Sequence, residues 1–165
     1  MVNKKSVIVY QIGSLGDTLV SIPAYRAIRR HFGPDTNVHV LHNAPPNMKA
    51  SPHQVLDGTN LIDGAVTFQQ YGGRSSWRTW IEVFRKLHSI RTDTVVYVAP
   101  AERTSNQVKR DKLFFKICGI RDLKGFHAYD TELFTRKQGV EPPFPIPHEA
   151  VLRLERLQKD GIAVD

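Results

Sequence analysis

The sequence predicts an α/β protein with a Rossmann-like, doubly wound parallel sheet, and three observations lead to this prediction. A β-branched and aromatic run near the N-terminus ends in a glycine turn, as a strand buried on both faces does. Helically spaced apolar residues then alternate with further short apolar runs. The 165 residues, of which 41% are hydrophobic, are enough for one domain with a sizeable core.

The first strand is predicted over Ser6 to Ile12. Because both of its faces are apolar, we expect it in the interior of the sheet. A helix is expected from Asp17 to Phe32, with Tyr25 and Ile28 on its apolar face. Pro23 should kink this helix, since proline removes a backbone donor.

The rest of the chain alternates in the same way, with no internal repeat. A proline-rich loop over 42–52, a glycine loop over 71–76 and a proline-rich connector over 141–147 separate the elements. Further strands are predicted at 37–41, 65–68, 94–98 and 123–126, and further helices through 80–87, 109–117 and 148–159. Trp77, Trp80, Phe114 and Phe115 are expected to face the core.

An acid, Asp17, stands where the first helix is expected to begin. It is either an N-cap, which stabilises a helix by ~1 kcal/mol, or an acceptor or general base for a substrate hydroxyl. The turn lacks the Gly-x-Gly-x-x-Gly and Gly-Lys-Ser/Thr patterns of nucleotide loops. A carboxylate there would also oppose an incoming phosphate. Ligands of open α/β sheets bind beyond the carboxyl ends of the strands, where this turn should lie.

The segment Ile12-Gly13-Ser14-Leu15-Gly16-Asp17-Thr18-Leu19, followed by Ile22-Pro23-Ala24 and Ala27-Ile28-Arg29-Arg30, resembles the N-terminus of glycosyltransferase family nine. These are the ADP-heptose:lipopolysaccharide heptosyltransferases and their relatives. The Ser-Leu-Gly-Asp element is the specific part of the resemblance. Weaker similarity continues through 37–41, 93–98, 118–120, 124–126 and 149–157.

The resemblance implies the N-terminal, acceptor-binding domain of a two-domain GT-B fold. This domain would comprise residues 1–147, and 148–165 would form a terminal helix and the start of a linker to a nucleotide-sugar domain. The implied activity is inverting, metal-independent transfer of heptose or another sugar from a nucleotide sugar to lipopolysaccharide or a related surface glycan. The donor would bind the other domain, so we expect no cofactor here and no turnover by this chain alone.

The resemblance also implies roles for individual residues. Asp17 matches the catalytic base of the family. The acceptor is expected to contact the turn around this acid and two arginines that follow a later strand: Gly13, Ser14, Leu15, Gly16, Thr18, Arg103 and Arg110. The chain departs from the family at 98–103, which reads Val-Ala-Pro-Ala-Glu-Arg where many members carry an Asp-x-Gln-Gly-like segment. The departure concerns the acceptor more than the class of reaction.

The formal net charge of +7 fits several partners. Scattered lysines and arginines usually form a solvated face. A nucleic-acid partner is not expected, because zinc-ligand spacing, an RNP-like aromatic segment and a recognition-helix pattern are all lacking. An anionic glycolipid acceptor suits Arg103 and Arg110, since arginine binds carboxylates and phosphates bidentately. Basic residues would also favour a peripheral contact with an anionic inner-membrane leaflet.

Redox and targeting signals are sparse. The single Cys118 cannot form an internal disulfide, and the seven histidines lack ligand spacing, so no metal site is expected. The sequence shows neither a signal peptide nor an apolar run of ~20 residues, which favours a cytoplasmic location. The alternative interpretation is a non-catalytic Rossmann-like binding or regulatory domain, or an inactive fragment, in which Asp17 serves only as a cap.

Overall fold

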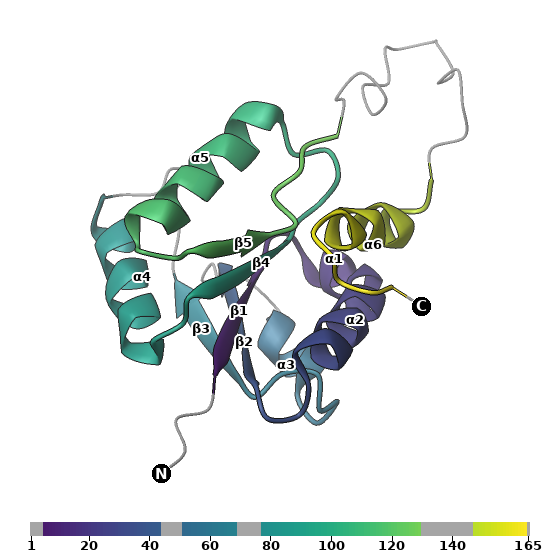
Figure 1. Cartoon of the computed structure of the whole chain (residues 1–165), viewed down its shortest axis with the longest axis horizontal. Helices are drawn as coiled ribbons and strands as arrows, with labels where there is room; N and C mark the ends of the chain where they lie inside the picture. The colour runs from purple at the N-terminus through teal and green to yellow at the C-terminus, as the bar shows by residue number, and fades with distance from the viewer. Residues whose placement is uncertain (1–4, 44–50, 69–76, 130–146, 165) are drawn as a thin grey trace.

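The protein is described here from a computed structural model covering residues 5–43, 51–68, 77–129 and 147–164. Its centre is a five-stranded, all-parallel sheet in the order β3-β2-β1-β4-β5 (Figure 1). The strands are β1 (Ser6–Gln11), β2 (Asn37–Asn43), β3 (Gly64–Phe68), β4 (Thr94–Val98) and β5 (Asp122–Lys124). This is the doubly wound, Rossmann-like fold that the sequence predicts, with β1 in the interior between β2 and β4.

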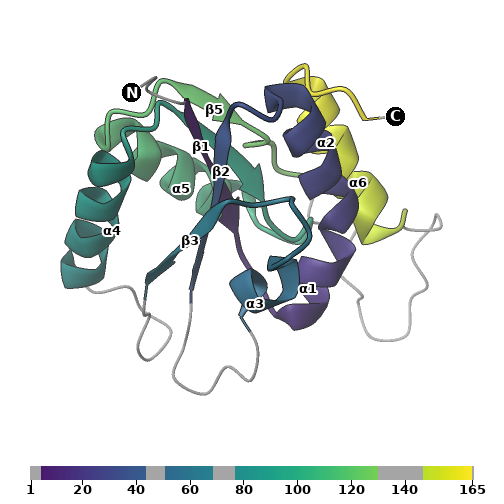
Figure 2. The same cartoon turned by 90° about the horizontal axis from the view of Figure 1, so that it is seen from below.

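Helices cover both faces of the sheet (Figure 2). On one side lie α4 (Trp77–Ile90) and α5 (Ser105–Ile117), over a core that includes Ile8, Tyr10 and Phe115. On the other lie α1 (Leu15–Val20), α2 (Ile22–Phe32), α3 (Pro52–Leu56) and α6 (Glu149–Lys159). The core on this second side includes Val7, Val9 and Tyr25. The alternation of β1 residues between the two cores explains why the strand is apolar from Val7 to Tyr10.

The first helix differs from the prediction at its start and in its middle. It begins at Leu15 rather than Asp17, and it is divided at Ser21 into α1 and α2. Pro23 lies in the first turn of α2, where a proline costs no hydrogen bond because the first N–H groups of a helix have no intrahelical partner. The expected kink is therefore a break between two helices.

Capping boxes mark two helix starts that apolar periodicity alone does not reveal. The short helix α3 (Pro52–Leu56) begins at the last residue of the predicted 42–52 loop, after the N-cap Ser51, whose partner is Gln54. Helix α5 begins four residues before the predicted 109, after Thr104, whose partner is Gln107. Both are Ser/Thr-x-x-Gln pairs, so the sequence carried the signal.

The other elements agree with prediction to within a few residues. Strand β4 and the end of α6 are as predicted, β2 runs two residues further, and β5 covers 122–124 rather than 123–126. Phe115 is buried as expected, but Trp77 is 68% exposed instead of facing the core. The predicted glycine loop at 71–76 and most of the 141–147 connector lie outside the described residues. Among the described helices, none combines the length and apolarity that crossing a bilayer requires.

Candidate functional site

The predicted site lies at the carboxyl edge of the sheet, between the ends of β1 and β4. These strands are neighbours, but α1 follows β1 on one face and α5 follows β4 on the other (Figures 1 and 2). The loops after the two strands therefore meet at the topological switch point, the usual ligand position in open α/β sheets. Asp17 belongs to the first of these connections and Arg103 to the second.

The turn after β1 is shaped around the Asp17 carboxylate. Gly13 has φ of 118°, and a Cβ there would lie only 2.4 Å from Asp17 Cγ, so both conformation and space require glycine. The backbone N–H and the hydroxyl of Ser14 donate to Asp17 Oδ2 over 2.7 and 2.9 Å. Ser14 is thus the N-cap, and Asp17 is the third helical residue that binds back to it. The N-cap assignment of Asp17 was wrong by three residues.

The other carboxylate oxygen of Asp17 forms an ion pair with Arg153 of α6. Arg153 Nη2 donates to Asp17 Oδ1 over 3.0 Å, and Nη1 donates to the Asp17 carbonyl over 2.7 Å and to the Ser21 hydroxyl. The guanidinium side chain is only 1% exposed. A cation buried this deeply needs its partners, so Asp17 compensates a buried charge as well as closing the helix start.

Glu149 extends this contact to the loop after β4. Its Oε1 accepts from Arg153 Nε over 2.9 Å and from the Ala101 N–H over 2.8 Å. A second buried arginine of α6, Arg156, donates to the carbonyl of Ala99 over 2.6 Å and to those of the two residues after it. We call Asp17, Glu149, Arg153 and Arg156 the α6 clamp. It fixes the loops after β1 and β4 relative to each other.

The α6 clamp is not predicted from the sequence. Glu149, Arg153 and Arg156 recur at helical spacing, which is the ordinary pattern of a solvated helix face. No sequence signal separates such a face from a buried charged one. The difference arises from tertiary packing, because α6 lies across α2 with Leu157 in the core.

Ser14 and Arg153 together favour the ionised form of Asp17. Partial burial by itself would raise the pKa of the carboxyl, but the two Ser14 donors and the Arg153 guanidinium outweigh it and lower the pKa below its ordinary value. Asp17 is therefore ionised at neutral pH. Its side chain remains 27% exposed, and both of its carboxylate oxygens already accept hydrogen bonds, from Ser14 and from Arg153.

Arg103 and Arg110 come together on a different acid. Arg103 Nη2 pairs with Asp111 Oδ2 over 2.6 Å, and its Nε donates to the Tyr97 hydroxyl over 3.2 Å. Arg110 binds Asp111 Oδ1 through Nε and Nη2. Asp111 is buried, so both arginines compensate its charge. Arg110 is mostly exposed and keeps donors free to face solvent, whereas Arg103 is largely enclosed.

The remaining predicted contact residues surround the turn. Ser14, Leu15 and Gly16 are exposed at its surface. The Thr18 side chain is fully buried and donates to the Ser14 carbonyl over 3.2 Å, so it supports the turn from beneath. The arrangement offers a ligand one ionised carboxylate, exposed backbone around it, and cations on the neighbouring loop and helix.

A crystal structure with this fold is known. Residues covering 99% of this chain superimpose on 43% of the chain of a glycosyl transferase family 9 protein from Veillonella parvula DSM 2008, with a TM-score of 0.59 and 21% sequence identity. This chain thus spans less than half the length of that transferase. No family model and no curated protein sequence matches the chain. At this identity the likeness establishes a shared fold alone, the α/β Rossmann-like fold.

Proposed function

We propose that the chain is the acceptor-binding domain of an inverting, metal-independent glycosyltransferase with a GT-B architecture. The observation that carries this proposal is the ionised Asp17 carboxylate, partly exposed at the switch point of the sheet. Two further observations support it: the Ser-Leu-Gly-Asp resemblance, and the superposition of nearly the whole chain on part of a family 9 transferase. The nucleotide-sugar donor is assigned to a separate domain.

In the proposed reaction, Asp17 acts on the hydroxyl of the acceptor glycan. The hydroxyl oxygen attacks the anomeric carbon, the bond from that carbon to the diphosphate oxygen breaks, and the proton passes to the carboxylate. A carboxylate with a lowered pKa is a weak base, so proton transfer would occur late, once the attacking oxygen has become acidic. Before that, Asp17 orients the hydroxyl, and fixed orientation accounts for part of the rate.

We further propose that the acceptor is anionic, a lipopolysaccharide precursor or a related surface glycan. Arg110 supports this because its exposed guanidinium lies beside the loop after β4 and carries donors that Asp111 does not take. Heptose is the sugar that the family resemblance suggests, and the proposal also includes transfer of another sugar from a nucleotide-sugar donor.

The alternative is a non-catalytic binding or regulatory domain. The observation that favours it is the structural role of Asp17. This residue accepts hydrogen bonds from Ser14 and compensates the buried charge of Arg153 without any substrate. In this alternative the Asp17 carboxylate serves only to hold the helix start and the α6 clamp together. The two functions predict different behaviour when Asp17 is replaced.

Transfer should be measured with the full product of the encoding gene, a panel of nucleotide sugars and lipopolysaccharide core acceptors. Asp17→Asn should lower turnover about 10²–10⁴-fold, the usual contribution of a positioned acid or base. Glu149→Ala is the matched control, because it also leaves Arg153 with one carboxylate but spares Asp17. Turnover lost equally in both variants would reduce Asp17 to a structural role, and no transfer from any donor would favour the binding domain.

A further inference from the structure

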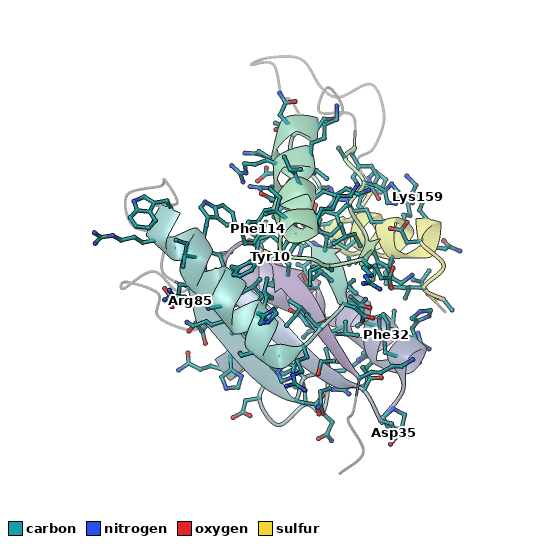
Figure 3. All side chains as sticks on the ribbon, turned by 60° about the vertical axis from the view of Figure 1, so that its left-hand side comes forward. Tyr10, Phe32, Asp35, Arg85, Phe114 and Lys159 are labelled. Atoms are coloured by element: carbon teal, nitrogen blue, oxygen red, sulfur yellow. The ribbon has the colours of Figure 1, made fainter. Side chains whose placement is uncertain are left out.

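The outer surface of α4 and α5 carries an apolar strip that the sheet does not cover. Trp80 of α4 and Phe114 of α5 pack against each other with ring centroids 4.2 Å apart, so the two helices meet at this pair. Phe114 is labelled in Figure 3. Beside this contact lie large apolar side chains that are exposed rather than buried. They are Trp77, Ile81 and Phe84 of α4, and Leu113 and Ile117 of α5. We call these five residues the α4–α5 strip.

The strip follows from the spacing of residues in each helix. In α4 the residues at 77, 81 and 84 lie one turn apart, next to the buried stripe of 79, 83 and 87. In α5 the residues at 113 and 117 lie opposite the buried residues 108, 111 and 115. Ile117 is 70% and Leu113 58% exposed. Exposed apolar residues gathered on two touching helices, rather than scattered singly, mark an interaction surface.

Basic residues flank the strip. Helices α4 and α5 together carry seven lysines and arginines against two acids; Glu82 pairs with Lys86 and Asp111 with Arg110, which leaves five basic residues in excess. Arg85 extends from the outer side of α4 (Figure 3). The Arg78 guanidinium lies over the Trp77 ring, 5.5 Å from its centroid, and forms a cation–π contact with it. Trp, Leu and Phe beside Lys and Arg form the usual composition of a helix that lies in a membrane interface.

We propose that the α4–α5 strip docks on an anionic bilayer surface. The apolar side chains would enter the boundary between headgroups and acyl chains, and the flanking cations would bind the lipid phosphates. Charge complementarity selects this occupant over a second copy of the chain, which would place two basic surfaces against each other. Docking goes beyond the proposed function, since it requires no sugar transfer, but it suits an acceptor anchored in lipid.

The geometry of the sheet keeps docking compatible with an open site. Helices α4 and α5 cover the face opposite α1, α2 and α6, which form the α6 clamp side (Figure 2). Because a parallel strand and its following helix run in opposite directions, Phe84 and Ile117, late in their helices, lie away from the carboxyl edge, whereas Trp77, at the start of α4, lies toward it. The strip is therefore separated from Asp17 by the sheet, because α4 and α5 lie on the face opposite α1.

Flotation with extruded vesicles tests the proposal. The chain should float with phosphatidylcholine vesicles containing 30 mol% phosphatidylglycerol at ~150 mM salt, about the physiological ionic strength, and should not float with phosphatidylcholine alone. Phe84→Ser with Ile117→Ser should weaken partitioning at least about tenfold. Lys109→Gln with Lys116→Gln should weaken it about 25-fold, at ~1 kcal/mol for each cation.

Matched controls lie on the opposite layer. Val151→Ser removes an exposed apolar residue of α6, and Arg26→Gln with Lys159→Gln removes two exposed charges from α2 and α6. These variants should bind vesicles like the wild type. Trp77 fluorescence should shift to the blue on binding, since its exposed ring would leave water. If the double serine variant is not folded by circular dichroism, Trp77→Ser replaces it.

Three results would overturn the proposal. The first is no flotation of the wild type. The second is equal loss in the charge control and the strip variants, which would indicate nonspecific adsorption of a basic protein. The third is a concentration-dependent dimer, measured by sedimentation, that the Phe84→Ser, Ile117→Ser variant abolishes while vesicles have no effect, which would make a second copy the occupant.

Discussion

At the scale of single residues, Gly13 and Asp17 depend on each other. The carboxylate occupies the space that a Cβ at position 13 would take, and this position lets it accept from Ser14 while it faces Arg153. The glycine turn and the acid could be predicted from the sequence, because residue type and order carry that information. The position of Asp17 three residues inside the cap was missed although Ser14 and Asp17 have the Ser-x-x-Asp spacing of a capping box. Its ion pair with Arg153 could not be predicted.

Replacing Gly13 tests this dependence. Gly13→Ala should destabilise the protein by about 3 kcal/mol, because a positive φ costs an L-residue ~1–2 kcal/mol and displacing the carboxylate loses hydrogen bonds to charged groups. Gly33→Ala is the control: Gly33 also has positive φ, at 79°, but nothing lies within 4 Å of its Cβ position. Urea unfolding should show the larger loss for Gly13. Equal losses in the two variants would mean that the carboxylate does not need this space.

At the scale of elements, α6 is the part of the site that comes from far along the chain. Residues 149–156 contact the turn after β1 and the loop after β4, more than 130 positions away in the case of Arg153 and Asp17. Local periodicity predicts that this helix exists and where it ends. It says nothing about which partners its charged face meets, because that depends on how the helix crosses α2.

A double-mutant cycle measures the central pair of the clamp. Asp17→Asn and Arg153→Met should each cost about 2–4 kcal/mol, with Asn placing an amide donor where a carboxylate oxygen accepted. The double variant should cost about 1–3 kcal/mol less than the two losses added together, because Met needs no carboxylate. Chemical denaturation of the four proteins gives this coupling. Simple additivity within ~0.5 kcal/mol would show that the pair contributes nothing specific.

At the scale of the whole molecule, the parallel sheet with β1 in its interior and the helices on both faces could be predicted, because the first four strands are mainly apolar runs that alternate with helices. The order of the strands in the sheet does not follow from that pattern, and the short β5 is only partly buried. Boundaries were less certain where a cap, not periodicity, starts the helix, as at Thr104. The exposed Trp77 was misplaced in the core since hydrophobicity alone cannot separate a core residue from one on an interaction surface. The fold and the turn after β1 could therefore be predicted from the sequence, whereas the α6 clamp and the α4–α5 strip depend on tertiary packing.

Stability should fall in two stages as the pH is lowered. Burial lowers the pKa of His42, and of His39, so these rings are neutral in the native state, and stability is lost as pH falls through about 6.5, the unfolded value. The carboxyls of Asp17 and Asp63 have lowered pKa values, so their contribution is present above ~4 and is lost only as pH falls through their native values.

Urea unfolding at about pH 7.5, 5.5 and 3.5 separates these stages, which lie on either side of the unfolded pKa values of histidine and aspartate. His42→Gln should reduce the loss between the first two conditions and leave the rest unchanged. Asp17→Asn should reduce only the loss below ~5, since the native carboxylate is ionised above that. If Asp17→Asn instead changed the loss of stability between about pH 7.5 and 5.5, the pKa of the native Asp17 carboxyl would lie above its ordinary value. That result would contradict the ion pair with Arg153.

The most direct test of the central claim, an acceptor-binding domain with its site at the carboxyl edge, is a titration of this chain followed by amide resonances. A soluble anionic lipopolysaccharide core oligosaccharide should shift the signals of Gly13 to Asp17 and of 99–103, and Asp17→Asn should weaken its binding. ADP- and UDP-sugars should bind no more tightly than about millimolar, or −4 kcal/mol. Micromolar binding of a nucleotide sugar, or oligosaccharide shifts confined to the opposite edge of the sheet, would contradict the account.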